Sequence, residues 1–282
     1  MRAQSAPRLV VVGQVGRDLV LQVEALPAPG VSGRVLARRE VLGGKGANQA
    51  VAGAQLGAQV SIIGVVGDDH VADTVLGTAG EDGVDVGWVI RRAGTPTGLI
   101  TEVIDSEGTW RYLEDLPEAV LLSEDDVTWA SPAMDGAQAV VVQLQQPPEA
   151  ALLAAQLASR AGCAVILDGA LPDDWRRGQL LRAADVVRCD THEAELVVGA
   201  DILGGEDARR HAEQLRASGP SLVVLGAGRD GNALAWEGGS AVLPLVDTEV
   251  VDTTGAGAPR RRGGRPPRRP AWPWPPWAGD PT

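Results

Sequence analysis

The feature that most constrains the fold is a glycine-rich loop followed by a helix and a buried strand, all within residues 43–69. The loop Gly43-Gly44-Lys45-Gly46 contains three glycines, which can adopt backbone angles that a β-carbon forbids. A helix is expected over residues 47–56, because small residues recur along one side of it and allow close packing on a sheet. Residues 60–66 are almost wholly apolar and predict a strand buried on both faces. A glycine loop at a helix N-terminus favours a polar ligand, because free N–H groups and the helix dipole meet there.

A strand–helix alternation in the second half of the chain predicts the fold class. After a first strand at residues 9–13, strands are expected at residues 139–144, 164–167, 185–188 and 221–225, and helices at residues 148–160, 191–198 and 206–218. Helices of this length between strands indicate parallel pairing with right-handed crossovers. We therefore expect an α/β fold with a Rossmann-like, doubly wound, mainly parallel sheet. Its ligand should bind at the carboxyl ends of the strands, where Asp168, Asp190 and Gly226 are placed.

The composition narrows the class of protein. A chain of 282 residues is long enough for one large α/β domain. A net charge of −12 argues against nucleic acid as a partner and fits a small-molecule enzyme. Cys163 and Cys189 lie far apart without a CxxC motif, so we expect buried, reduced thiols. No apolar run is long enough to span a membrane and no secretory signal is found, so a cytoplasmic location without a membrane partner is expected.

Two motifs carry a resemblance to a known family. Residues 43–50, GGKGANQA, followed by the turn Gly67-Asp68-Asp69, resemble the N-terminal signature of ribokinase-type, or phosphofructokinase B-type (PfkB), carbohydrate kinases. Residues 251–257, VDTTGAG, resemble a second motif of this family. The resemblance extends from about residue 9 to residue 257 and implies a ribokinase-like kinase domain over residues 1–257. It also implies transfer of the γ-phosphate of ATP, with Mg²⁺, to a hydroxyl of a small sugar.

The resemblance implies a small β-lid over the sugar, formed by residues 14–42 and 97–114, through which the chain would form a homodimer. From the residue pattern alone, these segments are only half-exposed strands. Asp18 aligns with the sugar-binding aspartate of the family, whereas without the resemblance it would be an ordinary surface carboxylate. The other residues that the resemblance assigns to the sugar site are Gly43, Gly44, Lys45, Asn48 and Asp252.

Two departures from the family pattern bear on the identity of the sugar. The family's Gly-Ala-Asn segment near residue 120 is replaced here by the sequence LPEA at residues 116–119, and a sugar-contacting glutamate of ribokinases aligns with Gln145. These departures weaken the match to ribokinases and leave ribose as only the best guess among small sugars and nucleosides.

The sequence Asp190-Thr191-His192-Glu193 has two compatible readings. It aligns with the family's N-x-x-E motif, in which the glutamate helps to organise Mg²⁺ near the phosphates, although Asp190 stands where the family has asparagine. Independently, Asp190 suits the N-cap of the helix at residues 191–198, with Glu193 completing a capping box. The histidines of the chain have no spacing typical of a metal site.

The sequence Gly226-Ala227-Gly228-Arg229-Asp230-Gly231 matches G-x-G-x-x-G without predicting a dinucleotide site. Residues 232–236 alternate as in a strand, whereas the dinucleotide fingerprint requires a helix there. A hairpin turn is expected instead, which argues against a nicotinamide-dependent oxidoreductase. The resemblance implies that this loop, with Gly226, Gly228 and Gly231, lines the nucleotide pocket.

The resemblance places the reaction centre at residues 252–257. The backbone N–H groups of Gly255, Ala256 and Gly257 would form an anion hole for the transferred phosphoryl group. Asp252 and Thr254 would contribute to a monovalent-cation site for K⁺. Asp252 would also bind sugar. The next residue should be the aspartate that accepts the proton of the sugar hydroxyl, and it is Ala258. Two functions remain open: a sugar kinase impaired by loss of its base, and a non-catalytic sugar or nucleotide binder.

Residues 258–282 depart from the family altogether. They carry six arginines and one aspartate among many prolines and tryptophans, so we expect a disordered, low-complexity tail. A polyproline II ligand and a membrane-surface segment are the alternatives. The sequence WPWPPW at residues 272–277 is encoded by TGG and CCN codons. Read one base earlier, these codons give Leu/Val/Met alternating with Ala, which is a helix-forming pattern, so we interpret the tail as a frameshift product.

This interpretation predicts that Ala258→Asp alone does not restore kinase activity, whereas restoring the reading frame does. General acid–base catalysis is typically worth about 10²–10⁴-fold, but the frameshift would also remove the helices that follow the base in the family. A coupled ADP-release assay on both proteins tests the prediction. Phosphorylation of ribose by the 282-residue chain at roughly 1–100 turnovers per second would contradict it.

Overall fold

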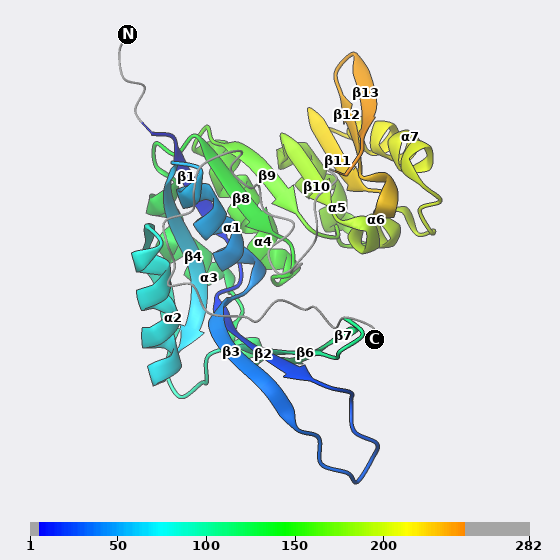
Figure 1. Cartoon of the computed structure of the whole chain (residues 1–282). Helices are drawn as coiled ribbons and strands as arrows, with labels where there is room; N and C mark the ends of the chain where they lie inside the picture. The colour runs from blue at the N-terminus through cyan, green and yellow to red at the C-terminus, as the bar shows by residue number, and fades with distance from the viewer. Residues whose placement is uncertain (1–5, 246–282) are drawn as a thin grey trace.

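The protein has a nine-stranded main sheet flanked by helices and a four-stranded sheet that projects from it (Figure 1). The computed structural model describes residues 6–245. The main sheet has the order β13-β12-β11-β10-β9-β8-β1-β4-β5. Its strands are β1 (Arg8–Val12), β4 (Gln59–Gly67), β5 (Val84–Arg92), β8 (Ala139–Gln143), β9 (Ala164–Asp168), β10 (Val186–Cys189), β11 (Leu222–Gly226), β12 (Asn232–Trp236) and β13 (Gly239–Leu243).

In this order, all neighbouring strands from β5 to β11 pair in parallel. The pairs β11–β12 and β12–β13 are antiparallel. The expected doubly wound, mainly parallel α/β sheet is therefore confirmed. The antiparallel pairing of β11 with β12 also confirms that the G-x-G-x-x-G sequence forms a hairpin turn, which contains the short 3₁₀ helix Gly228–Asp230.

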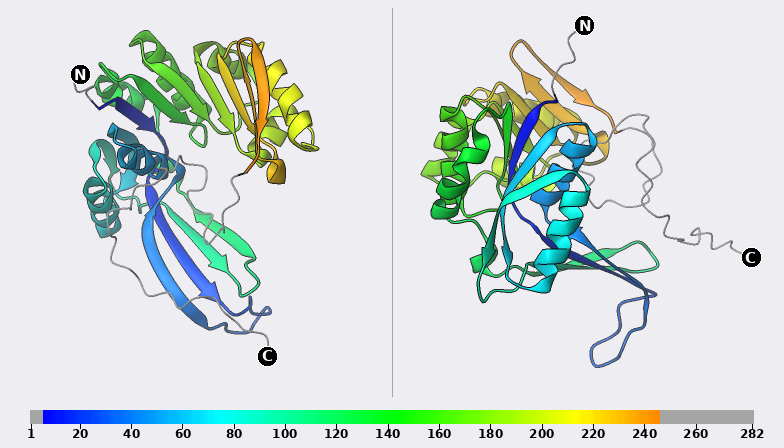
Figure 2. Two further views of the ribbon diagram at one scale, coloured as in Figure 1. Left: turned by 45° about the horizontal axis from the view of Figure 1, so that its top comes forward. Right: turned by 90° about the vertical axis from the view of Figure 1, so that its left-hand side faces the viewer.

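Helices cover both faces of the main sheet (Figure 2). The helices are α1 (Lys45–Gln55), α2 (His70–Glu81), α3 (Glu124–Ala130), α4 (Pro148–Arg160), α5 (Trp175–Ala183), α6 (Thr191–Val198) and α7 (Gly205–Arg216). Alternation along β1 sends Val10 and Val12 into the core beneath α3 and α4, and sends Val11 into the core beneath α1 and α2. None of the helices within residues 6–245 is long and apolar enough to cross a membrane.

The projecting sheet has the order β3-β2-β6-β7 and corresponds to the expected lid. Its strands are β2 (Gly16–Val23), β3 (Val35–Gly43), β6 (Leu99–Ile104) and β7 (Trp110–Asp115). Only Gly44 separates β3 from α1. The lid is therefore joined directly to the helix that the glycine loop begins.

One face of the main sheet is only partly covered by the described helices. Every helix from α3 onward places its buried apolar side chains in the core beneath α3 and α4, or in a small cluster beside it. On the opposite face of β9 to β11, the apolar side chains of Ile166, Val186, Leu222 and Val224 are half-buried.

We predict that this face binds hydrophobic dye and drives association of the full chain, because a partly exposed apolar patch promotes contacts between molecules. The double substitution Ile166→Thr and Val224→Thr keeps strand propensity and should lower both 8-anilinonaphthalene-1-sulfonate fluorescence and the oligomeric fraction. As a control, Val223→Thr in the covered core should lower the melting temperature without lowering dye binding. A sharp, cooperative thermal transition of a monomer that binds no dye would contradict the prediction.

Candidate functional site

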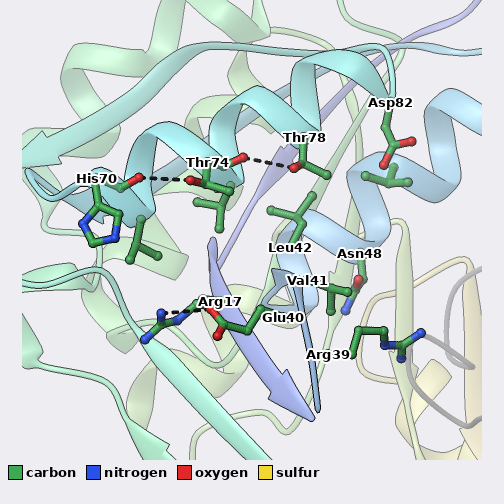
Figure 3. A pocket seen from close by; sticks show the side chains of 13 residues that line it. Arg17, Arg39, Glu40, Val41, Leu42, Asn48, His70, Thr74, Thr78 and Asp82 are labelled. Atoms are coloured by element: carbon green, nitrogen blue, oxygen red, sulfur yellow. Dashed lines mark hydrogen bonds and ion pairs between the residues drawn. The ribbon is translucent and has the colours of Figure 1, made fainter. Parts of the chain in front are cut away.

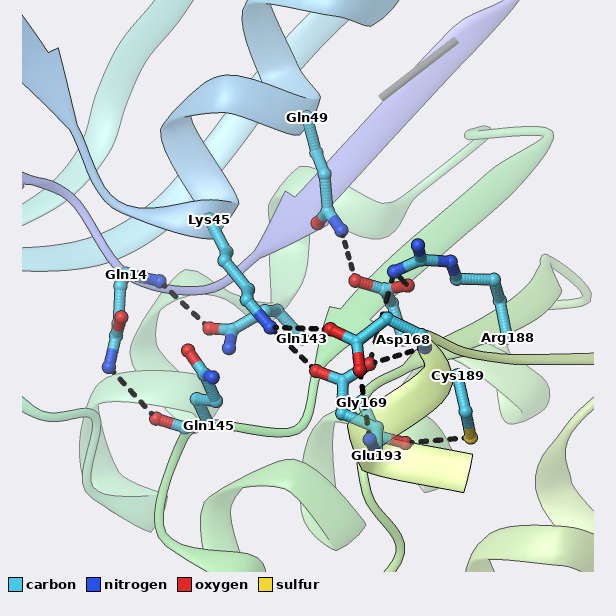
Figure 4. Close-up of polar contacts among 11 residues, drawn as sticks. Gln14, Lys45, Gln49, Gln143, Gln145, Asp168, Gly169, Arg188, Cys189 and Glu193 are labelled. Atoms are coloured by element: carbon cyan, nitrogen blue, oxygen red, sulfur yellow. Dashed lines mark hydrogen bonds and ion pairs between the residues drawn. The ribbon is translucent and has the colours of Figure 1, made fainter. Parts of the chain in front are cut away.

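The carboxyl ends of β1, β8, β9 and β10 meet the N-termini of α1 and α6 at one edge of the main sheet (Figure 4). Two hydrogen-bonded groups lie there. In one, the Gln14 backbone N–H donates to Gln143 Oε1 and Gln14 Nε2 donates to the Gln145 carbonyl; in the other, the side chains of α1, α6 and the ends of β9 and β10 bond to one another. This polar cluster consists of Gln14, Lys45, Gln49, Gln143, Gln145, Asp168, Arg188 and Glu193. It lies where a doubly wound sheet is expected to bind its ligand.

The glycine loop is shaped by close approach as well as by backbone angle. Gly44 has a φ of 93°, which favours glycine. A β-carbon on Gly43 would lie 2.0 Å from Asp18 Oδ1, and one on Gly46 would lie 2.6 Å from the backbone of Gly13. The loop can therefore pass between the lid and the end of β1 only without side chains at these positions.

Asp190 and Glu193 form the expected capping box at the start of α6. An Asp190 carboxylate oxygen accepts a hydrogen bond from the Glu193 backbone N–H, and the Glu193 carboxylate accepts one from the Asp190 N–H, both at 2.8 Å. The second Glu193 oxygen accepts a 2.6 Å bond from Lys45 Nζ, which also lies 3.8 Å from Asp190 Oδ2. The N-termini of α1 and α6 are thus joined by an ion pair.

Asp168 connects three elements at the ligand edge where the sequence places it, although no contact was predicted for it. Its carboxylate accepts hydrogen bonds from Gln49 Nε2 at 2.6 Å and from an Arg188 guanidinium N–H at 3.0 Å. Burial opposes the charge on Arg188, but the carboxylates of Asp168 and Glu193 outweigh it and raise the pKa of Arg188. Gln49 belongs to the GGKGANQA motif, but no contact was predicted for it, and Arg188 lies in no motif. The position of Asp168 at a strand end was the signal available for that residue.

The two cysteines are buried and form no disulfide, as the sequence predicts. Burial and nearby carboxylates raise the pKa of Cys189, beside the polar cluster, to about 12. The Cys189 thiol therefore stays protonated and donates to the Gly169 carbonyl at 3.3 Å. Burial and a raised pKa disfavour the thiolate, which is the nucleophilic form of cysteine.

Asp18 lies inside the base of the lid and is not a surface carboxylate. It is 9% exposed, and its Oδ1 atom has no hydrogen-bond partner. Burial, followed by the nearby Glu102 carboxylate, raises the pKa of Asp18 to about 6, whereas Arg39 and the Gly44 N–H act in the opposite direction. A buried carboxylate oxygen without a partner is suited to accept a hydrogen bond from a ligand.

Asn48 faces a cavity of about 360 Å³ between α1, α2 and β3 (Figure 3). The cavity is also lined by Arg39 and Val41 from the lid and by His70 and Thr74 from α2. Asn48 and Asp18 belong to the sugar residues implied by the resemblance, and the structure places them in different cavities: Asn48 lines this one, and Asp18 lines a small cavity at the base of the lid.

The glycines expected at the nucleotide pocket lie beside the N-terminus of α6. The Gly228 N–H donates to the Thr191 hydroxyl at 2.9 Å, and a β-carbon on Gly226 would lie 2.5 Å from the Thr191 backbone nitrogen. Gly231 closes the same turn, with a φ of 102°. The remaining predicted residues, Asp252, Thr254, Gly255, Ala256, Gly257 and Ala258, lie outside the described residues.

A parallel sheet with a β-lid and a lysine-bearing glycine loop at its carboxyl edge defines a carbohydrate-kinase class of α/β phosphotransferase. The match is specific: the model of the pfkB family carbohydrate kinases covers residues 6–257, and the chain belongs to this family.

Several of the curated relatives are ribokinases. The chain is 29% identical over 251 residues to ribokinase of Staphylococcus aureus (strain COL), covering 89% of this chain and 82% of the relative. It is 28% identical to Haemophilus influenzae ribokinase, covering 88% of this chain and 81% of the relative. The structure of Arabidopsis thaliana ribokinase complexed with ribose and ATP superposes with a TM-score of 0.75 at 28% identity, covering 89% of this chain and 82% of the other.

The raised pKa of Asp18 predicts that Asp18→Asn stabilises the ligand-free protein at pH 7.5. A carboxyl whose folded pKa is raised from 3.8 to about 6 destabilises the fold once it ionises. The free energy of unfolding should therefore rise on substitution by the order of 1–3 kcal/mol above pH 6. This increase should disappear as the pH falls through 6 towards 4. Thermal melts across this range test it, with the exposed Asp73→Asn as control. Equal melting shifts at pH 4 and pH 7.5 would contradict the assignment.

Proposed function

We propose that this chain binds ATP and a small sugar, with ribose as the best guess, at the carboxyl edge of the main sheet, and that it transfers the γ-phosphate of ATP inefficiently. The observation that carries the proposal is the position of the glycine loop, which contacts Asp18 of the lid at Gly43 and reaches the capped N-terminus of α6 through Lys45. The ribose and ATP bound in the Arabidopsis thaliana ribokinase structure support this choice of ligands.

The sugar would be held between the lid and the glycine loop. The Asp18 oxygen that lacks a partner would accept hydrogen bonds from sugar hydroxyls, and the loop would offer the backbone of Gly43 and Gly44. Lys45, Asn48 and Asp252 complete the set of proposed sugar contacts, and the ammonium group of Lys45 would also face the triphosphate.

The triphosphate would lie between Lys45 and the N-terminus of α6, where an ammonium group and helix N–H groups favour anions. Gly226, Gly228 and Gly231 would allow the nucleotide to approach the turn closely. Glu193 would help to organise Mg²⁺ indirectly, since Lys45 Nζ already contacts its carboxylate, and Asp190 would lie beside the nucleotide. Mg²⁺ would neutralise charge on the phosphates.

The chemical step would depend on the anion hole at Gly255, Ala256 and Gly257, and on K⁺ near Asp252 and Thr254. With alanine at position 258, no carboxylate takes the proton from the sugar hydroxyl there, so turnover would be lowered by about 10²–10⁴-fold. A non-catalytic sugar or nucleotide binder is the second candidate, because Asp18 and Lys45 are both in place without that base.

The proposal includes the organisation of the chain. Residues 1–257 would form the kinase domain, and residues 258–282, which lie outside the described residues, would follow it as a separate tail. A homodimer would form through the lid, where Leu36 and Leu113 are 54% and 66% exposed, and the location would be cytoplasmic.

Calorimetry with ribose and with ATP–Mg²⁺, beside an ADP-release assay, tests the proposed function. Asp18→Ala should weaken ribose binding and Lys45→Met should weaken ATP binding, each by roughly 10–100-fold, because each removes a charged hydrogen-bonding group. Asp73→Ala, on the exposed side of α2, should change neither affinity. Binding of both ligands with little ADP release would support impairment, and binding without any ADP release would favour the second candidate. If neither ribose nor ATP–Mg²⁺ binds, both candidate functions are refuted.

A further inference from the structure

Arg188 lies near the carboxyl end of β10, at the ligand edge of the main sheet (Figure 4). Its side chain is 26% exposed, and it is in register with Asp168 on β9. One nitrogen of its guanidinium, Nη1, donates to Asp168 Oδ1 at 3.0 Å and lies 3.9 Å from Glu193 Oε2. Both carboxylates are buried, so the charge of Arg188 is held at this position by two anions.

The other two nitrogens of the Arg188 guanidinium are open. Among residues 6–245, neither Nε nor Nη2 donates a hydrogen bond, and neither is a buried atom without a partner. An arginine that serves only to neutralise a carboxylate frequently binds it through two parallel N–H bonds. Arg188 instead gives Asp168 a single nitrogen and keeps N–H donors for a further acceptor.

Asp168 fixes the direction of this guanidinium. Its Oδ1 accepts the bond from Arg188, and its Oδ2 accepts one from Gln49 Nε2 at 2.6 Å. Gln49 lies one turn after Lys45 on α1, so one face of this helix contacts both Asp168 and Glu193. A buried carboxylate whose two oxygens are both bonded to protein donors holds its partner in one orientation.

Lys45 and Arg188 face different oxygens of the Glu193 carboxylate. Lys45 Nζ donates to Oε1 at 2.6 Å, whereas Arg188 Nη1 is near Oε2. Glu193 lies in the first turn of α6, where the helix dipole also favours an anion. A triphosphate that contacts Lys45 at this helix terminus would therefore lie beside the open donors of Arg188.

We propose that Arg188 is a further phosphate-binding residue of the nucleotide site. Its Nε and Nη2 groups donate to oxygens of the triphosphate, and Asp168 is the positioning residue that directs them. The planar fork of a guanidinium suits two phosphate oxygens at once, whereas the ammonium group of Lys45 acts as a point charge. The inference rests on the proposed function, because it concerns the same nucleotide site.

Calorimetry of the full chain with ATP–Mg²⁺ and with ribose tests the inference. Arg188→Met should weaken ATP–Mg²⁺ binding by roughly tenfold or more, because it removes charged hydrogen bonds to the phosphates, and should leave ribose affinity unchanged. It should also make ATP affinity less dependent on salt concentration. Arg188→Lys keeps the charge without the fork and should recover only part of the loss. The matched control is Arg160→Met, on the exposed last turn of α4, which should change neither affinity.

A double-mutant cycle tests the part played by Asp168. If charge alone matters, removal of an anion near the triphosphate strengthens ATP–Mg²⁺ binding. We expect Asp168→Ala to weaken it instead, because the guanidinium loses its fixed direction. The same substitution should cause no further loss in a chain that already carries Arg188→Met, because Asp168 acts through Arg188. Tighter or unchanged ATP–Mg²⁺ binding by Asp168→Ala would overturn the positioning role.

The outcome for Arg188→Met separates the inference from the proposed function. Unchanged ATP–Mg²⁺ affinity at an unchanged melting temperature would overturn the inference alone. An equal loss of ATP–Mg²⁺ and ribose affinity with a lowered melting temperature, fully restored by Arg188→Lys, would show a structural charge and overturn it as well. Failure of the unaltered chain to bind ATP–Mg²⁺ would overturn the proposed nucleotide site together with it.

Discussion

The passage of the glycine loop between Asp18 and the end of β1 is the constraint on which the site depends. A β-carbon at Gly43 or Gly46 would collide with the Asp18 carboxylate or with the backbone that follows β1. The same passage brings the Gly44 N–H to Asp18 and points the first turn of α1 at the ends of β9 and β10. Two sheets that share no hydrogen-bonded strand are thereby held in one arrangement.

Charge at the carboxyl edge is balanced locally. Lys45 and Arg188 face the carboxylates of Asp168, Asp190 and Glu193, and Glu193 contacts both cations, at 2.6 and 3.9 Å. No group of three or more His, Cys, Asp or Glu side chains that could hold a metal ion by itself occurs within residues 6–245. A divalent ion at this edge would therefore share its coordination with the phosphates of its nucleotide, as Mg²⁺ commonly does.

Local patterns were sufficient to predict much of the fold and part of the site. The helices Pro148–Arg160 and Thr191–Val198 begin and end where the sequence indicates, and the capping box of Asp190 and Glu193 spans only three residues. The contacts of Asp168 join residues 119 and 20 positions away, so no local pattern could reveal them. The burial of Asp18 likewise arises from packing between the lid and the loop. Helix α1 begins at Lys45, two residues before the expected start, because Gly44 supplies the non-helical residue at its N-terminus.

The single residue between β3 and α1 has a mechanical consequence. Gly44 is the whole connection between the lid strand and the helix that carries Lys45, and its backbone occupies a region of angles that glycine enters freely. A change in the backbone angles of Gly44 would alter the angle between β3 and the first turn of α1. Since Lys45 begins that turn and its ammonium group contacts Glu193, the direction of the lid strand relative to this charge is set by one residue.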